Sequence, residues 1–205
     1  AKHWGAVANH SGDAYFDFFY RCDWPNTLNE LERYRQPPLK EGSGPRSVGA
    51  TAERRLVQGE DDGRVRRFLR AVWKKRKISP AEGHALMNVC MAATYDPDPG
   101  VQLGFRLPFH LDTGELIEAR WKRWLRHDPV TLVGRCAGNL KSLKGVYIDC
   151  GWRDQYHIHY GTRLLARRLA AAGVPHRYDE FDDNHSDIDY RMEVSLPYLY
   201  RALKP

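Results

Sequence analysis

Apolar residues along this chain follow two different periods, and the periods predict where strands and helices lie. Short runs of small and apolar residues at positions 5–9 and 145–149 are typical of buried parallel strands. A third strand is predicted at His176–Phe181, after a helical pattern at Thr162–Ala172 that Gly173 ends. Strand, helix and strand in this order indicate a β-α-β unit in a parallel sheet.

Residues 14–128 instead repeat their apolar positions with the helical period. A helix capped by Asn26 is followed by an exposed loop at residues 37–50, which is rich in Pro, Gly and Ser. The helix predicted after Gly63 carries a single apolar stripe, made of Val65, Phe68, Leu69, Val72 and Trp73. This part of the chain is therefore expected to be mostly helical.

Ser79 begins the best-defined helix of this region. Ser79 is predicted at the N-cap, Pro80 at the first helical position and Glu82 at the third, which together make a capping box. This helix is expected to bury Leu86, Val89, Cys90 and Ala93. Residues 114–126 form a further helix that places Ile117, Trp121, Trp124 and Leu125 on one face. The last helix of the chain is expected to bury Met192, Leu196, Leu199 and Leu203.

These patterns divide the chain into three regions. Residues 1–13 supply a strand and turn of an α/β core, residues 14–128 a mostly helical cap or lid, and residues 129–205 the remaining core. An independent helical domain is the alternative for the middle region. Three parallel strands leave a bare sheet edge, and the chain begins at Ala1 without an initiator Met. We therefore expect a missing N-terminal segment or a companion chain to complete the sheet.

Composition and charge narrow the class of protein. The chain has 205 residues, of which 42% are hydrophobic and 28% charged, so it can bury a sizeable core. The net charge is +6, with a basic cluster within residues 64–77. No nucleic-acid-binding motif accompanies that cluster, so we interpret it as a solvated helix face and do not expect a nucleic-acid partner.

Membrane insertion and targeting leave no signature in the sequence. No apolar run approaches the roughly 20 residues that cross a bilayer, so no membrane partner is expected. No signal peptide is present, and the localisation stays open, with the cytoplasm slightly favoured.

The candidate chemistry lies in the loops that follow the last two predicted strands. Asp154 follows the strand at 145–149, and His185 follows the strand at 176–181. Loops at the carboxyl ends of parallel strands meet at one edge of a sheet, so these side chains are expected to lie together. A His that acts as general base needs a carboxylate to fix its tautomer, and Asp154 can supply it. Asp149 competes for this role, but its place at the strand end favours bracing the turn.

The chain offers no convincing nucleophile for such a pair. No Gly-x-Ser-x-Gly motif occurs in it. Ser11 follows a strand and precedes a Gly, but Asn9 and Asp13 stand where a nucleophile elbow needs small residues. Ser43 lies in the predicted flexible loop. We therefore expect the nucleophilic Ser to lie outside this chain.

The sequence gives no clear pattern of metal ligands. His157 and His159 are two residues apart, in a region that more closely fits the start of a helix than a strand. The acidic residues between 179 and 189 lack the EF-hand spacing for calcium. Four widely spaced cysteines without a C-x-x-C motif argue against a zinc ribbon and are expected to be buried free thiols. We expect no metal and no cofactor.

Several stretches of the chain resemble one family. They are Trp4–Asp13 (WGAVANHSGD), Leu107–Phe109 (LPF), Trp121–Pro129 (WKRWLRHDP), Tyr147–Asp154 (YIDCGWRD) and Phe181–His185 (FDDNH). In order and spacing they are similar to the C-terminal part of the α/β-hydrolase esterases related to esterase D and the antigen 85 mycolyltransferases. The last two stretches are the most specific.

The resemblance implies a partial α/β-hydrolase with a helical cap, acting on a small-molecule ester by Ser-His-Asp acyl transfer. Asp154 would be the triad acid and His185 the general base. The family's nucleophile elbow would lie just before a segment like residues 1–13, and it has no counterpart here. A non-catalytic hydrolase-like binding module is the alternative, since the chain then needs no nucleophile.

Overall fold

The computed structural model describes residues 3–36 and 58–204. The chain divides into two compact units, each considered by itself. The first, here called the sheet unit, contains residues 1–21 and 126–205, and the second, the helical unit, contains residues 22–125. The predicted loop at 37–50, with Ser43, lies outside the described residues. Within the described ranges no helix is long and apolar enough to cross a membrane.

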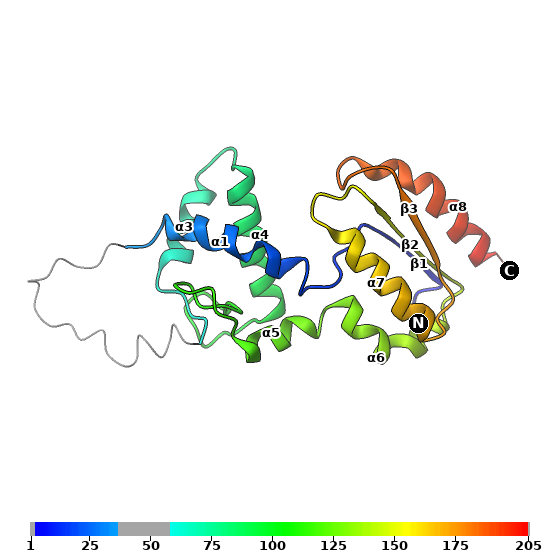
Figure 1. The fold of residues 1–205 in the computed structure, drawn as a ribbon, viewed down its shortest axis with the longest axis horizontal. Helices are drawn as coiled ribbons and strands as arrows, with labels where there is room; N and C mark the ends of the chain where they lie inside the picture. Colours follow the sequence, from blue (N-terminus) through cyan, green and yellow to red (C-terminus); the bar gives the residue numbers. More distant parts are fainter. Residues whose placement is uncertain (1–2, 37–57, 205) are drawn as a thin grey trace, which may run out of the picture. The chain divides into compact units, whose positions relative to one another are not determined.

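The sheet unit contains three parallel strands in the order β1-β2-β3 (Figure 1). They are β1 (Ala6–His10), β2 (Gly145–Gly151) and β3 (Arg177–Phe181). Every residue of the central strand β2 is buried, because it has a strand on each side and helices on both faces. The predicted mixed α/β architecture with a parallel sheet is confirmed.

Three helices flank this sheet: α6 (Pro129–Lys141), α7 (Ile158–Ala171) and α8 (Met192–Leu203). Figure 1 shows α6 and α7 on one side of the strands and α8 on the other. The first side forms the apolar core, built from Ala14, Val130, Val133, Val146, Ile148, Leu165, Leu169 and Val174. A short 3-10 turn, η1 (Ile188–Arg191), precedes α8. Helix α7 begins four residues before the predicted Thr162.

Helix α6 was not predicted, although its start carries a recognisable signal. Asp128 is its N-cap and accepts a hydrogen bond from the backbone N–H of Val130 at 3.0 Å, and Pro129 follows at the first helical position. The same carboxylate accepts the backbone N–H groups of Tyr15 and Phe16 at 3.0 and 3.2 Å. Asp128 therefore fixes both the start of α6 and the loop that leaves β1.

The predicted buried face of α8 is wrong. Met192, Leu196 and Leu203 are 45%, 57% and 46% exposed, whereas Ser195 is buried. The Ser195 hydroxyl is 2.9 Å from Nε2 of His10, and this long-range hydrogen bond turns a polar residue toward the sheet. The pattern of apolar residues in the sequence cannot show such a contact. The buried face of α8 is therefore displaced by one residue from the predicted one, with Ser195 in place of Leu196.

The helical unit contains most of α1 (Tyr20–Glu32), together with α3 (Arg64–Trp73), α4 (Pro80–Tyr95) and α5 (Glu118–Leu125). Asn26 lies inside α1 and does not cap it, because the helix already begins at Tyr20. Trp73, predicted on the apolar stripe of α3, is 88% exposed because it is the last residue of that helix. Trp121 and Trp124 of α5 are buried as predicted.

The buried stripe of α4 is also displaced from its predicted position. Its buried residues are Glu82, Ala85, Asn88, Val89 and Ala92, while Cys90 and Ala93 are exposed. The amide of Asn88 donates to Asp23 at 2.8 Å and to Thr27 at 2.9 Å, which draws this polar residue inward. Cys22 is also exposed, so the expectation of buried thiols fails for Cys22 and Cys90.

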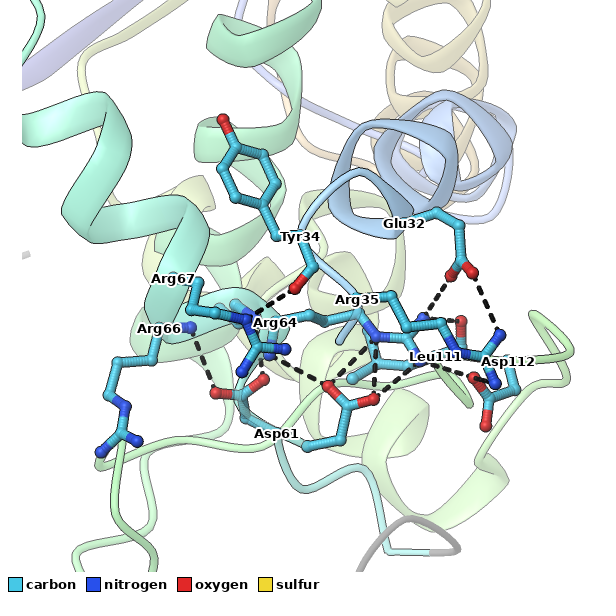
Figure 2. A network of polar contacts seen from close by, with 11 residues as sticks. Glu32, Tyr34, Arg35, Asp61, Arg64, Arg66, Arg67, Leu111 and Asp112 are labelled. Carbon is cyan, nitrogen blue, oxygen red and sulfur yellow. Dashed lines mark hydrogen bonds and ion pairs between the residues drawn. The ribbon is translucent and has the colours of Figure 1, made fainter. Parts of the chain in front are cut away.

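A fully buried arginine organises the start of α3. The guanidinium of Arg64 donates to Asp62, to Glu32, to Asp112 and to the backbone carbonyl of Leu111. Figure 2 shows Glu32, Leu111 and Asp112 around Arg64, together with Asp61. Asp61 accepts the backbone N–H groups of Val65 and Arg66 at 2.8 and 3.1 Å and so satisfies the first turn of the helix.

Replacing Ser79 by Ala is expected to destabilise the helical unit by about 1 kcal/mol. The predicted capping box is present, since the Ser79 hydroxyl accepts from the Glu82 N–H at 3.2 Å and Glu82 accepts from the Ser79 N–H at 2.9 Å. Denaturant unfolding of the two proteins measures the difference. Ser79→Asp, which can still cap, should restore most of it, and an equal loss in both variants would contradict a capping role.

Candidate active site

The structure brings the two predicted site residues together at the carboxyl edge of the sheet. Nδ1 of His185 lies 2.9 Å from Oδ2 of Asp154. Asp154 follows β2 and is completely buried as a side chain, while His185 follows β3 and is 35% exposed. With Nδ1–H donated to Asp154, Nε2 is the ring nitrogen left to exchange a proton with a reacting group.

Local hydrogen bonds hold both partners in place. Oδ1 of Asp154 accepts the backbone N–H of Tyr156 at 2.8 Å, so the carboxylate is fixed by the turn that leads into α7. The backbone N–H of His185 donates to Oε1 of Gln155 at 3.0 Å. The ring of Tyr156 meets the ring of His185 edge to face, at 5.0 Å between centroids. The imidazole is therefore preorganised.

The two groups shift each other's proton affinity in the directions expected of a base and its carboxylate. The hydrogen bond to Asp154 raises the pKa of His185 above its ordinary value, although burial acts the other way. Burial acts to raise the pKa of Asp154, but the hydrogen bonds from His185 and the Tyr156 N–H outweigh it and lower this pKa. Asp154 is thus ionised over the range in which His185 titrates.

Ser11 does not reach this pair. Its side chain is 3% exposed, and its hydroxyl donates to Sγ of Cys150 at 3.5 Å. Cys150 itself is buried, and burial raises the pKa of its thiol to about 12, so it is no thiolate nucleophile. Among the described residues, no hydrogen bond joins a Ser, Thr or Cys side chain to His185, and Ser43 lies outside them.

Asp149 has a different role from Asp154. Its carboxylate accepts hydrogen bonds from His10 at 2.7 Å, Tyr147 at 2.8 Å and Arg191 at 2.9 Å. His10 reaches Ser195 with its other ring nitrogen, which makes a second Ser-His-Asp arrangement. Ser195 is only 1% exposed, so this set is closed to substrate and fastens α8 to the sheet.

The described residues contain no group of three or more His, Cys, Asp or Glu side chains placed to hold a metal ion. His157 stands at the N-cap of α7 and His159 is buried in its first turn. Of the acidic residues after 178, Asp179, Glu180 and Asp182 form ion pairs with Arg177, Arg163 and Arg153.

Sequence reasoning missed one carboxylate at this edge. Asp13 lies in the turn after β1 and is close enough to His185 for each charge to affect the pKa of the other. Its position in the sequence could have indicated this. The Ser11-Gly12-Asp13 turn follows β1, and the carboxyl end of β1 lies at the same edge of the sheet as the loops after β2 and β3.

No protein-family model matches the chain, and no curated protein matches it. Among solved structures, the chain is similar to a ferulic acid esterase, with 18% identical residues and a TM-score of 0.33. The match covers 55% of this chain and 40% of the esterase, so it spans less than half of that protein's length. The proposals below rest on the geometry around Asp154 and His185.

Proposed function

We propose that this chain supplies the acid and the base of a serine carboxylesterase whose nucleophilic Ser lies outside these residues. The observation that carries the proposal is the hydrogen bond of 2.9 Å between a buried carboxylate and a part-exposed imidazole at the carboxyl edge of a parallel sheet. This is the pairing that activates a Ser hydroxyl in acyl-transfer enzymes.

In the reaction, Nε2 of His185 takes the proton of the Ser hydroxyl as its oxygen attacks the ester carbonyl carbon. Asp154 stabilises the imidazolium that forms. The imidazolium then protonates the departing alcohol oxygen, which leaves an acyl-enzyme. Water attacks this intermediate with His185 again as base, and the carboxylic acid leaves as the Ser hydroxyl is restored. The residues named here need no cofactor for these steps.

The fold assignment belongs to the same proposal. The three parallel strands would be the last strands of an α/β-hydrolase sheet, and β1 would pair with a strand from the missing segment or companion chain. The predicted insertion at residues 14–128, which contains the helical unit, would be the cap that selects the ester. A small-molecule ester is the substrate class that this arrangement serves.

A fluorophosphonate probe applied to the full-length protein, with intact masses of every species, tests the proposal. A fluorophosphonate labels a Ser only when a base activates it. A label outside the present residues, lost in His185→Ala, is the expected result. A label on Ser11 would place the nucleophile inside the chain, against the proposal. No label on a folded sample would indicate the non-catalytic binding module.

A further inference from the structure

The outward side of α8 is a continuous apolar stripe. Met192, Leu196, Tyr200 and Leu203 follow one another at helical spacing, and all four side chains are exposed, Tyr200 most of all at 64%. We call these four residues the α8 stripe. The opposite side of the helix turns Ser195 toward the sheet. A helix of a folded protein normally buries such a stripe against another element, so this side of α8 fits a protein contact.

The stripe runs beside the edge strand β1 from one end to the other. Helix α8 packs on β2 and β1. Leu203, its last residue, lies against Gly5, since a Cβ added there would come within 2.6 Å of the Leu203 Cδ2. Arg191, just before α8, donates to Asp149, which is in register with the last residue of β1. Trp4, which precedes Gly5, is 70% exposed, so exposed apolar surface continues at the amino end of β1.

The direction in which the strands are connected determines which helix can cover this stripe. The chain crosses the sheet in one direction from β1 to β2 to β3, and α6 and α7, which lead into β2 and β3, lie on one face (Figure 1). A helix that led directly into β1 from a strand beyond it would lie on that same face, because crossovers are right-handed. A helix on the face of α8 must therefore belong to a crossover that runs in the opposite direction, away from β1.

We propose that the α8 stripe and the open edge of β1 form one binding surface for the polypeptide that carries the nucleophilic Ser. A strand of this partner pairs with β1, and an amphipathic helix, from a crossover directed away from β1, packs its apolar side on the stripe. The stripe and β1 are both about 16 Å long, so one strand and one helix of ordinary length cover them together.

This inference rests on the proposed function, since it names the partner of the same site. A partner strand that runs parallel to β1 ends at the edge of the sheet that carries Asp154 and His185. The surface on α8 and β1 therefore sets the position of the Ser relative to the acid and the base.

Protection of an introduced thiol in the full-length protein tests the contact. Leu196→Cys puts a thiol in the middle of the stripe, and Arg201→Cys puts one at an exposed position of the same helix outside it. Peptide masses follow the modification of each thiol by N-ethylmaleimide and separate it from the native cysteines. Leu196→Cys is expected to react about tenfold more slowly or less, because the packed helix must first move away. Equal rates in the folded protein would overturn the proposal.

Photocrosslinking identifies what covers the stripe. Leu196→p-benzoylphenylalanine in the full-length protein is expected to crosslink to a helix of the Ser-bearing polypeptide other than the one that leads directly into β1. A crosslink to α8 of a second copy, or no crosslink in the folded protein, would overturn the proposal.

Both readouts are independent of catalysis, so they separate this inference from the proposed function. A fluorophosphonate-labelled Ser together with a freely reactive Leu196→Cys thiol would overturn the binding surface alone. Protection and the expected helix crosslink without any labelled Ser in the unmodified protein would overturn the assignment of the partner as the bearer of the nucleophile, and the proposed function with it.

Discussion

Replacing His185 by Ala in the full-length protein is expected to lower kcat/KM for ester hydrolysis by about 10⁴-fold or more. Without the imidazole, no group in the described site can take the proton of the Ser hydroxyl or return it to the leaving alcohol. The loss should lie mainly in kcat, because His185 acts on the transition state and not on the bound ester. Steady-state hydrolysis of a p-nitrophenyl ester measures it. His127→Ala, at an exposed position, is the matched control.

Asp154→Asn should lower kcat/KM by roughly 10³- to 10⁴-fold, because the amide no longer fixes the ring tautomer or stabilises the imidazolium. The dependence of activity on pH gives a second readout, which the loss of a merely structural residue would not shift. His185 is active when neutral, so activity rises with pH through its pKa, which Asp154 raises. Removing Asp154 therefore moves the acidic limb to lower pH. Asp182→Asn, on an exposed side chain of the next loop, should change neither the rate nor the limb.

The double variant distinguishes one catalytic unit from two separate effects. If Asp154 acts only through His185, then His185→Ala with Asp154→Asn is no slower than His185→Ala alone. Full additivity of the two losses would contradict the assignment of Asp154 as the orienting acid. Normal activity in the single His185→Ala variant would remove the base from this chain altogether.

The position of the site could be predicted from the sequence because it depends on topology more than on packing. A residue that follows a parallel strand lies at the carboxyl edge whatever its neighbours are, so Asp154 and His185 were expected together. The contact of 2.9 Å agrees with that expectation, while their catalytic roles stay predictions. Asp13 obeys the same rule, since its turn follows β1, but the sequence assigned it no role at the site.

Buried faces were harder to predict because buried polar residues decide them. Ser195 turns inward through His10, and Asn88 turns inward through Asp23 and Thr27. Each partner is distant in sequence, so the spacing of apolar residues along one helix carries no information about these hydrogen bonds. The capping box of α4, in contrast, is local and could be predicted in full from Ser79 and Glu82.

Replacing Arg64 by Met is expected to destabilise the helical unit by about 3 kcal/mol, the largest stability effect among the substitutions considered. Its side chain is 1% exposed and pairs with Asp62, Glu32 and Asp112. Removing the guanidinium breaks the ion pair of Asp62 and leaves a backbone carbonyl, that of Leu111, without its donor, while Glu32 and Asp112 still pair with Arg35. The network in Figure 2 joins α1, α3 and the segment around residue 111, so its loss should weaken all three together.

Denaturant unfolding at neutral pH measures the loss of stability in Arg64→Met. Unfolding at acidic pH measures how the stability of each variant depends on pH. Burial acts to raise the pKa of Asp62, but the hydrogen bonds from Arg64 lower it below the ordinary value. A carboxyl with a lowered folded-state pKa stabilises the fold above its unfolded pKa and loses that contribution as the pH falls through the folded one. Arg64→Met should therefore lower the stability at neutral pH and make the stability depend less on pH in the acidic range.

Arg70→Met is the control. Arg70 is at an exposed position on the same helix, and its replacement should change stability by no more than roughly 0.5 kcal/mol. An equal loss in both variants would show that charge or helix propensity, and not the buried network, explains the effect.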